Sequence, residues 1–221
     1  YEGGSLRYPV LYMHDGQNLF DVRTSFLGEW KVDEACEQLI GSSQMPPIMV
    51  VGIENSPNRL TEYTPWPAPG YGGGGGDAYL QAIVEVLKPE IDRRYRTLQG
   101  PRYTWMAGSS LGGLISVYAG YTHAGTFGRV AAMSPSYWWD SDHFAAFAQA
   151  QGRGGLILFY QDMGTLEAGS VTDANGNGVD DYLEDLRAVH AIALAQGFAE
   201  GGDFRSVEAS GGVKLVWNMG E

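Results

Sequence analysis

The sequence has little cysteine, little positive charge and no long apolar run, and each shortage excludes a class of protein. A single cysteine, Cys36, cannot form an intrachain disulfide, and its place in a helical pattern favours packing over nucleophilic chemistry. The 14 Lys and Arg against 26 Asp and Glu leave a net charge of −12, which disfavours nucleic acid and anionic membrane surfaces as partners. No apolar run reaches the roughly 18 residues of a membrane span. We predict no nucleic-acid partner and no membrane span.

The composition is that of a folded domain, with 44% hydrophobic and 18% charged residues. Its 221 residues suit one domain over 1–221. The first residues resemble the tail of a turn and the last ones lack a closing helix, so we expect a chain shortened at both ends.

Apolar strand patterns alternate with helical ones, which predicts an α/β fold with a mostly parallel sheet and helices on both faces. The expected strands are 8–13, 48–53, 103–107, 130–133, 156–160 and 204–208, and the expected helices are 29–39, 77–95, 111–119, 144–150 and 182–196. The stretch 56–76 ends in five glycines, and we expect it to be a mobile loop without regular structure. Asp77 is a candidate N-cap of the helix that follows.

A nucleophile elbow is predicted at Gly108-Ser109-Ser110-Leu111-Gly112, which fits Gly-x-Ser-x-Gly between a strand and a helix. Such a turn strains the central serine and requires small residues on either side. Ser110 is therefore the candidate nucleophile. The N–H of Leu111 is the first candidate oxyanion donor, and the N–H of Gln17, after the first strand, is the second.

Several segments resemble the esterase family that includes enterochelin esterases, feruloyl esterases and S-formylglutathione hydrolases. They cover roughly residues 5–170 in the right order: 8–21, 58–65, 95–97, 108–113 and 127–138. The resemblance implies an α/β-hydrolase fold and hydrolysis of carboxylic esters without a redox or nucleotide cofactor. It also implies an acid after the fifth strand, where Glu167 matches best and Asp162 is the alternative.

The same resemblance implies a catalytic histidine near Gly212 or Val213, and none is present there. A structural role is favoured for His14, and His123, His143 and His190 lie where catalysis is not expected. The base could be missing because the C-terminal segment is altered, because another histidine is recruited, or because the protein binds without reacting. The first explanation is favoured, so activity of this chain is in doubt.

Residues 173–184 match the calcium-loop pattern D-x-[DN]-x-[DN]-G-x5-E. The oxygen ligands would come from Asp173, Asn175, Asn177, the Val179 carbonyl, Asp181 and Glu184. Asp180 departs from the pattern, because an aliphatic residue is usual at the eighth position. The motif favours a structural Ca²⁺ over a plain Asn-Gly turn, and a localisation leaning to the periplasm or outside the cell.

The leading hypothesis is a serine carboxylic ester hydrolase that forms an acyl-enzyme on a small-molecule or polysaccharide-linked ester. One alternative is a binding protein that stacks a sugar or aromatic ligand on Trp66, Tyr71, Tyr137, Trp138 and Trp139. Another is an acyltransferase. The sequence indicates neither the acyl group, the alcohol nor an oligomeric state.

Overall fold

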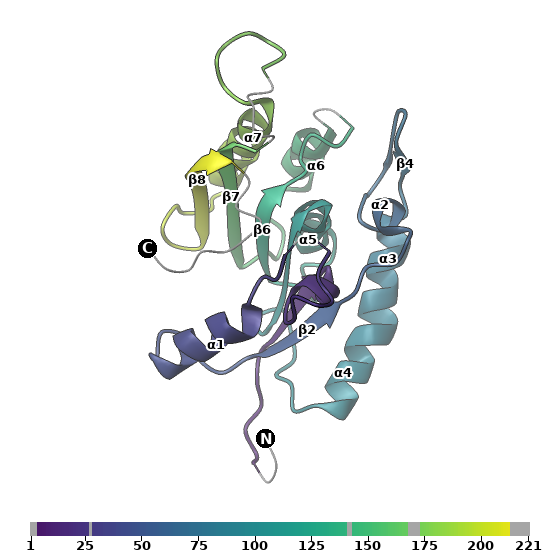
Figure 1. Cartoon of the computed structure of the whole chain (residues 1–221), viewed down its shortest axis with the longest axis vertical. Helices are drawn as coiled ribbons and strands as arrows, with labels where there is room; N and C mark the ends of the chain where they lie inside the picture. The colour runs from purple at the N-terminus through teal and green to yellow at the C-terminus, as the bar shows by residue number, and fades with distance from the viewer. Residues whose placement is uncertain (1–3, 27, 141–142, 168–172, 213–221) are drawn as a thin grey trace.

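A single sheet of six parallel strands organises the residues that the computed structural model describes, which are 4–26, 28–140, 143–167 and 173–212 (Figure 1). The spatial order of the strands is β2-β1-β5-β6-β7-β8. Their bounds are β1 Val10–His14, β2 Met49–Ile53, β5 Thr104–Ser110, β6 Arg129–Pro135, β7 Leu158–Leu166 and β8 Phe204–Gly212. The first strand, β1, lies next to the edge strand β2, and after β2 the chain crosses back over β1 to β5 and continues to the opposite edge.

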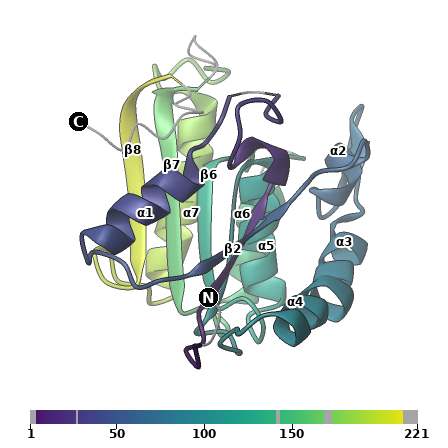
Figure 2. The same ribbon diagram turned by 60° about the horizontal axis from the view of Figure 1, so that its bottom comes forward.

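Helices lie on both faces of this sheet (Figure 2). Helix α1 (Val32–Gly41) covers one face. On the other face lie α5 (Leu111–Thr122), α6 (His143–Gln151), α7 (Asp181–Ala195) and a long helix made of α3 (Gly76–Ala82), the π-helix η2 (Ile83–Leu87) and α4 (Lys88–Arg94). The short elements are η1 (Gly16–Asn18), α2 (Arg59–Glu62) and the two-stranded β3 (Pro67–Ala68) and β4 (Gly72–Gly73).

Alternation along each strand divides the core into two clusters. In β1, Val10 and Tyr12 belong to the larger cluster on the α5 face, whereas Met13 belongs to the smaller cluster beneath α1. Helix α5 is buried almost all round, because it packs against β5 and β6 and is covered by neighbouring helices. The helix that follows Ser110 is thus the best anchored in the fold.

The predicted α/β class and mostly parallel sheet are confirmed, but the glycine-rich stretch differs from the prediction. It holds α2 and the β3–β4 pair instead of an irregular loop. Its glycines serve close packing: a Cβ on Gly73 would lie 2.4 Å from Thr64 Oγ1, and one on Gly76 would lie 2.9 Å from Ile115. The prediction of a stretch without regular structure was wrong because the glycines let the chain pack closely against neighbouring side chains.

Asp77 is also placed differently from the prediction. The long helix begins at Gly76, with Gly75 as its N-cap, and the Asp77 carboxylate accepts a hydrogen bond from the Tyr118 hydroxyl at 2.8 Å. Asp77 therefore ties this helix to α5 instead of capping its end. Among the residues described, no helix is both long and apolar enough to cross a membrane.

Candidate active site

Ser110 lies at a strained turn where β5 passes directly into α5. Its φ of 54° and ψ of −125° are far from the conformations that a serine prefers. The turn closes tightly, since a Cβ on Gly108 would lie 2.7 Å from the carbonyl of Gly112, and one on Gly113 would lie 3.1 Å from Pro135. The three glycines allow the chain to bend here, and the serine remains partly exposed at the carboxyl edge of the sheet.

The nearest polar partner of the nucleophile comes from the loop after β6. The Ser110 and Ser136 hydroxyls are 3.1 Å apart, and the Ser136 N–H donates to the Ser110 carbonyl at 3.0 Å. From the sequence, Ser136 is only a member of the segment 127–138 that resembles the esterase family. Its contact depends on the β5–β6 pairing, in which Ser110 lies beside Pro135.

The two predicted oxyanion donors lie at neighbouring strand ends. Leu111 is the first residue of α5, so its N–H is one of those without a partner inside the helix. Gln17 lies in η1, directly after β1, and β1 pairs with β5. A Cβ on Gly112 would come within 3.1 Å of the His14 Cβ, which shows that the start of α5 touches the end of β1.

Asp162, in the middle of β7, and Glu167, directly after its last residue, converge on Ser134. Glu167 is buried, and its Oε1 accepts hydrogen bonds from the Ser134 hydroxyl at 2.7 Å and from the Gly164 N–H. Asp162 accepts from the Ser134 N–H through Oδ1 and from the Tyr160 hydroxyl through Oδ2. Burial raises the pKa of Asp162. Among the described residues, the hydrogen-bond partners of Glu167 lie at Oε1.

The position expected for the base lies beside Glu167. Gly212 is the last residue of β8 and pairs with Leu166 of β7. The other expected position, Val213, is outside the described residues. A side chain introduced at Gly212 would therefore lie opposite Leu166, the residue next to Glu167 in the chain.

None of the four histidines, all of which are described, hydrogen-bonds to Ser110. The Nδ1 of His14 pairs with the Tyr79 hydroxyl at 2.9 Å, and burial lowers the pKa of this histidine to about 4. His123 follows the C-terminal end of α5, His143 pairs with Asp140, and His190 faces Glu200.

The predicted calcium ligands lie in the loop before α7 and in the first turn of that helix. The Asp173 carboxylate accepts from the N–H groups of Asn177 and Gly178, and the amides of Asn175 and Asn177 both donate to the Glu184 carboxylate. Asp181 accepts from the N–H of Ala174. Asp180 is instead the N-cap of α7, accepting from the Tyr182 N–H at 3.0 Å. This capping accounts for the departure at the eighth position.

The aromatic residues of the binding hypothesis fall into two groups. Tyr137 and Trp139 are almost completely buried and belong to the core. Tyr71 is 63% exposed, and its ring lies 6.2 Å from that of Trp138 and 5.8 Å from that of Trp139. The ring of Trp138 also lies 5.9 Å from that of Trp139 and 6.1 Å from that of Tyr182. Trp66 is partly buried against His143, with 4.2 Å between ring centroids. Of the five residues in the binding hypothesis, Tyr71 is thus exposed and Trp66 and Trp138 are partly buried.

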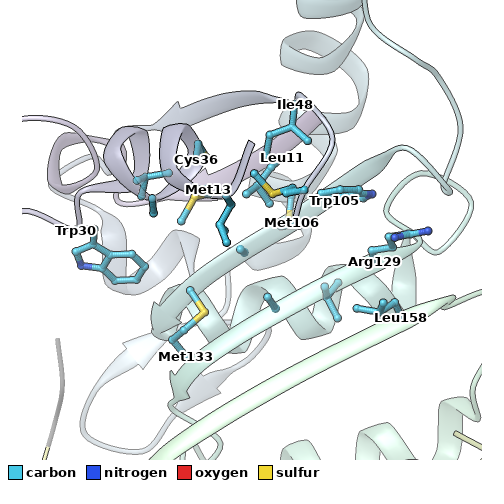
Figure 3. Close-up of a pocket in the computed structure, with 17 residues that line it drawn as sticks. Leu11, Met13, Trp30, Cys36, Ile48, Trp105, Met106, Arg129, Met133 and Leu158 are labelled. Atoms are coloured by element: carbon cyan, nitrogen blue, oxygen red, sulfur yellow. The ribbon is translucent and has the colours of Figure 1, made fainter. Parts of the chain in front are cut away.

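An apolar cavity of about 390 Å³ lies apart from this site, between α1 and the sheet (Figure 3). Trp30, Cys36, Trp105 and Met133 are among its walls, and Ser110 is not. Burial raises the pKa of the Cys36 thiol and so disfavours the reactive thiolate.

Solved structures share this fold. They include the BES protein from Bacillus cereus (TM-score 0.69, 20% identity, 96% of this chain and 78% of that one) and the enterobactin esterase FES from Shigella flexneri (TM-score 0.68, 19% identity, 93% and 48%). At these identities the likeness concerns the fold, and it confirms the α/β-hydrolase architecture.

Curated relatives are similar over parts of their length. The Uncharacterized protein YbbA of Bacillus subtilis (strain 168) is 33% identical over 147 residues, which cover 64% of this chain and 55% of that protein. The ferri-bacillibactin esterase BesA of the same organism is 26% identical over 218 residues, covering 86% and 69%. The siderophore triacetylfusarinine C esterase of Aspergillus fumigatus is 29% identical over 140 residues, covering 60% and 46%. The chain thus spans between 46% and 69% of the length of these relatives.

A family model described as "Putative esterase" matches residues 1–197, which is most of the chain. The match agrees with the segments that resembled this family and with the strand order around Ser110. The chain belongs to this esterase family.

Proposed function

We propose that the protein is a carboxylic ester hydrolase with Ser110 as its nucleophile. The observation that carries this proposal is the strained serine at the β5–α5 turn, partly exposed at the edge where the six parallel strands end. Strain of this kind persists where it serves a function. The names of the related siderophore esterases favour a small-molecule ester as the substrate.

In the proposed reaction the Ser110 oxygen attacks the acyl carbon and loses its proton to a base. The N–H groups of Leu111 and Gln17 stabilise the oxyanion, the alcohol leaves with a proton, and water then hydrolyses the acyl-enzyme. Glu167 would orient the base and stabilise its protonated form. Because the described histidines do not reach Ser110, we propose that proton transfer limits turnover in this chain.

Labelling with a fluorophosphonate probe tests the proposal. We expect an adduct on Ser110 in the wild-type protein, no adduct in Ser110→Ala, and an unchanged adduct in Ser109→Ala. Ser109 is the matched control because it is the adjacent serine, lies in the same strand and lacks the strained conformation. A wild-type protein without any adduct that still binds an aromatic or sugar ligand would favour the binding function.

We also propose that residues 173–184 bind one Ca²⁺. The proposal is supported by the hydrogen bonds that Asn175 and Asn177 donate to Glu184 and Gly178 donates to Asp173, and by Gly176 and Gly178, whose positive φ angles let the loop turn. Calcium should raise the melting temperature by several degrees, and a chelator should reverse the increase. Asp173→Ala should abolish this response. Identical melting curves with calcium and with chelator would contradict the proposal.

A further inference from the structure

We propose that the Asp15–Arg59 ion pair is a positioning device that holds the Gln17 amide at the oxyanion site, an inference that rests on the proposed esterase function. The ion pair is bidentate. Arg59 Nε and Nη2 each lie 2.7 Å from a different oxygen of the Asp15 carboxylate. The Arg59 side chain is 26% exposed and the Asp15 side chain 7% exposed. Removing Arg59 would therefore leave a buried carboxylate without its ion-pair partner, which is strongly destabilising.

The segment around Arg59 holds the oxyanion loop at several further points. Asn55 donates from its side-chain amide to Asp15 Oδ1, and its backbone N–H donates to the Gln17 side chain at 3.1 Å. The Tyr63 hydroxyl accepts a hydrogen bond from the Asp15 N–H at 3.2 Å. Three residues from one short segment therefore fix Asp15 and Gln17 together.

The loop needs this support because its backbone is strained and tightly enclosed. Asp15 has a left-handed conformation, with φ of 56° and ψ of 47°. Gly16 is pressed against the end of β2, since a Cβ there would lie 2.6 Å from the Gly52 carbonyl carbon. Without the ion pair, Asp15 would be free to return to a preferred conformation and would carry the Gln17 amide with it.

The same carboxylate lies beside the nucleophile's helix. A Cβ on Gly112 would lie 3.6 Å from Asp15 Oδ2, and Gly112 directly follows Leu111, the first oxyanion donor. Asp15 therefore stands between the two donors and sets the position of one relative to the other. Oxyanion stabilisation depends on donors held within a few tenths of an ångström of their place.

The rate of fluorophosphonate labelling at Ser110 tests this role. Arg59→Gln should lower the maximal labelling rate by roughly tenfold to a hundredfold, at unchanged apparent affinity for the probe. Arg59→Lys keeps the charge but loses the bidentate geometry, so its rate should be intermediate. Arg153→Gln is the matched control, because it breaks the Arg153–Asp203 ion pair at the other end of the sheet and should label like the wild type. An Arg59→Gln rate equal to that of the control would overturn the inference.

Hydrogen exchange gives a second measurement that does not depend on reactivity. The Asn18 and Leu19 amides close η1 by donating to Asp15 and Gly16 carbonyls. They should exchange at least about tenfold faster in Arg59→Gln than in Arg153→Gln. Unchanged exchange would refute the positioning role even if labelling fell. A wild-type protein that takes no label would refute the proposed function, and the exchange data would still decide whether the ion pair positions the loop.

Discussion

The turn at the nucleophile depends on the close approach of two residues without side chains. Gly108 and Gly112 flank Ser110, and the backbone of one occupies the place where a Cβ of the other would lie. We expect Gly108→Ala to lower the free energy of unfolding by about 1–3 kcal/mol, because the added methyl group forces the turn apart. It should also abolish labelling of Ser110, and urea unfolding measured beside labelling checks both effects.

Gly125→Ala is the control for this substitution. Gly125 has open space around its Cβ position and no positive φ, so the change should stay below about 0.5 kcal/mol. If Gly108→Ala were equally well tolerated, the strained turn would not be the determinant of the site.

His14 makes stability depend on pH. Burial lowers its pKa to about 4, below the ordinary value of 6.5, while the nearby Asp15 charge opposes this effect in part. The unfolded chain therefore takes up the proton at a higher pH than the folded one. The contribution is complete above pH 6.5 and falls as the pH decreases toward 4, by on the order of 3 kcal/mol.

Urea unfolding of the wild type and of His14→Gln between pH 7 and pH 4.5 measures this contribution. The variant should lose less stability over this range than the wild type. His123→Gln, at the other end of α5, should keep the wild-type dependence. Equal pH dependence in the wild type and in His14→Gln would show that His14 is not protonated on unfolding.

At the scale of the elements, apolar runs predicted every strand of the main sheet but not where each one ends. The predicted strand 156–160 extends to Leu166 in β7, and 204–208 extends to Gly212 in β8, because these ends pair with each other. They include Asp162, Gly164, Ala209, Gly211 and Gly212, which are residue types that strands contain less often. Since the acid and the expected base position lie there, local sequence could not show their proximity.

Spacing alone predicted the strained turn at Ser110, because one segment contains all the determinants of that turn. The calcium loop at 173–184 is likewise predicted from one segment, and its ion stays a prediction. The Asp15–Arg59 pair joins two segments 44 residues apart, and only the fold brings them together. The resemblance covered both segments without indicating that they touch.

Helix α7 offers a test of its capping residue. The Asp180 side chain caps the helix, so Asp180→Ala should lower the free energy of unfolding by about 1 kcal/mol. Asp180→Asn keeps an acceptor oxygen and should lower it by less than half as much. Both variants should retain the response to calcium, because Asp180 is not among the proposed ligands. A lost response in Asp180→Asn would place this residue among the ligands; thermal unfolding with calcium and with chelator measures both quantities.

At the scale of the whole molecule, the parallel sheet gathers the ends of distant strands along one edge. Four strands contribute to the site there: Gln17 follows β1, Ser110 ends β5, Glu167 follows β7, and Gly212 ends β8. The end of β8 is adjacent to the acid and has no imidazole. We expect Gly212→His or Val213→His to raise the labelling rate of Ser110 by roughly a hundredfold or more, since a general base contributes about 10² to 10⁴.

The double variant with Glu167→Gln is the control for this gain. It should remove most of the increase, because the new imidazole would lose the carboxylate that orients it. No increase in either histidine variant would count against the proposed location of the base.

The strand order also bears on how the protein is made. Strand β2 follows β1 and pairs with it, but β5, which pairs with the other edge of β1, begins only about 50 residues after β2 ends. Synthesis of that gap takes roughly five seconds. Through that interval one edge of β1 has no strand beside it, so β1 is where a nascent chain would first need protection by a chaperone.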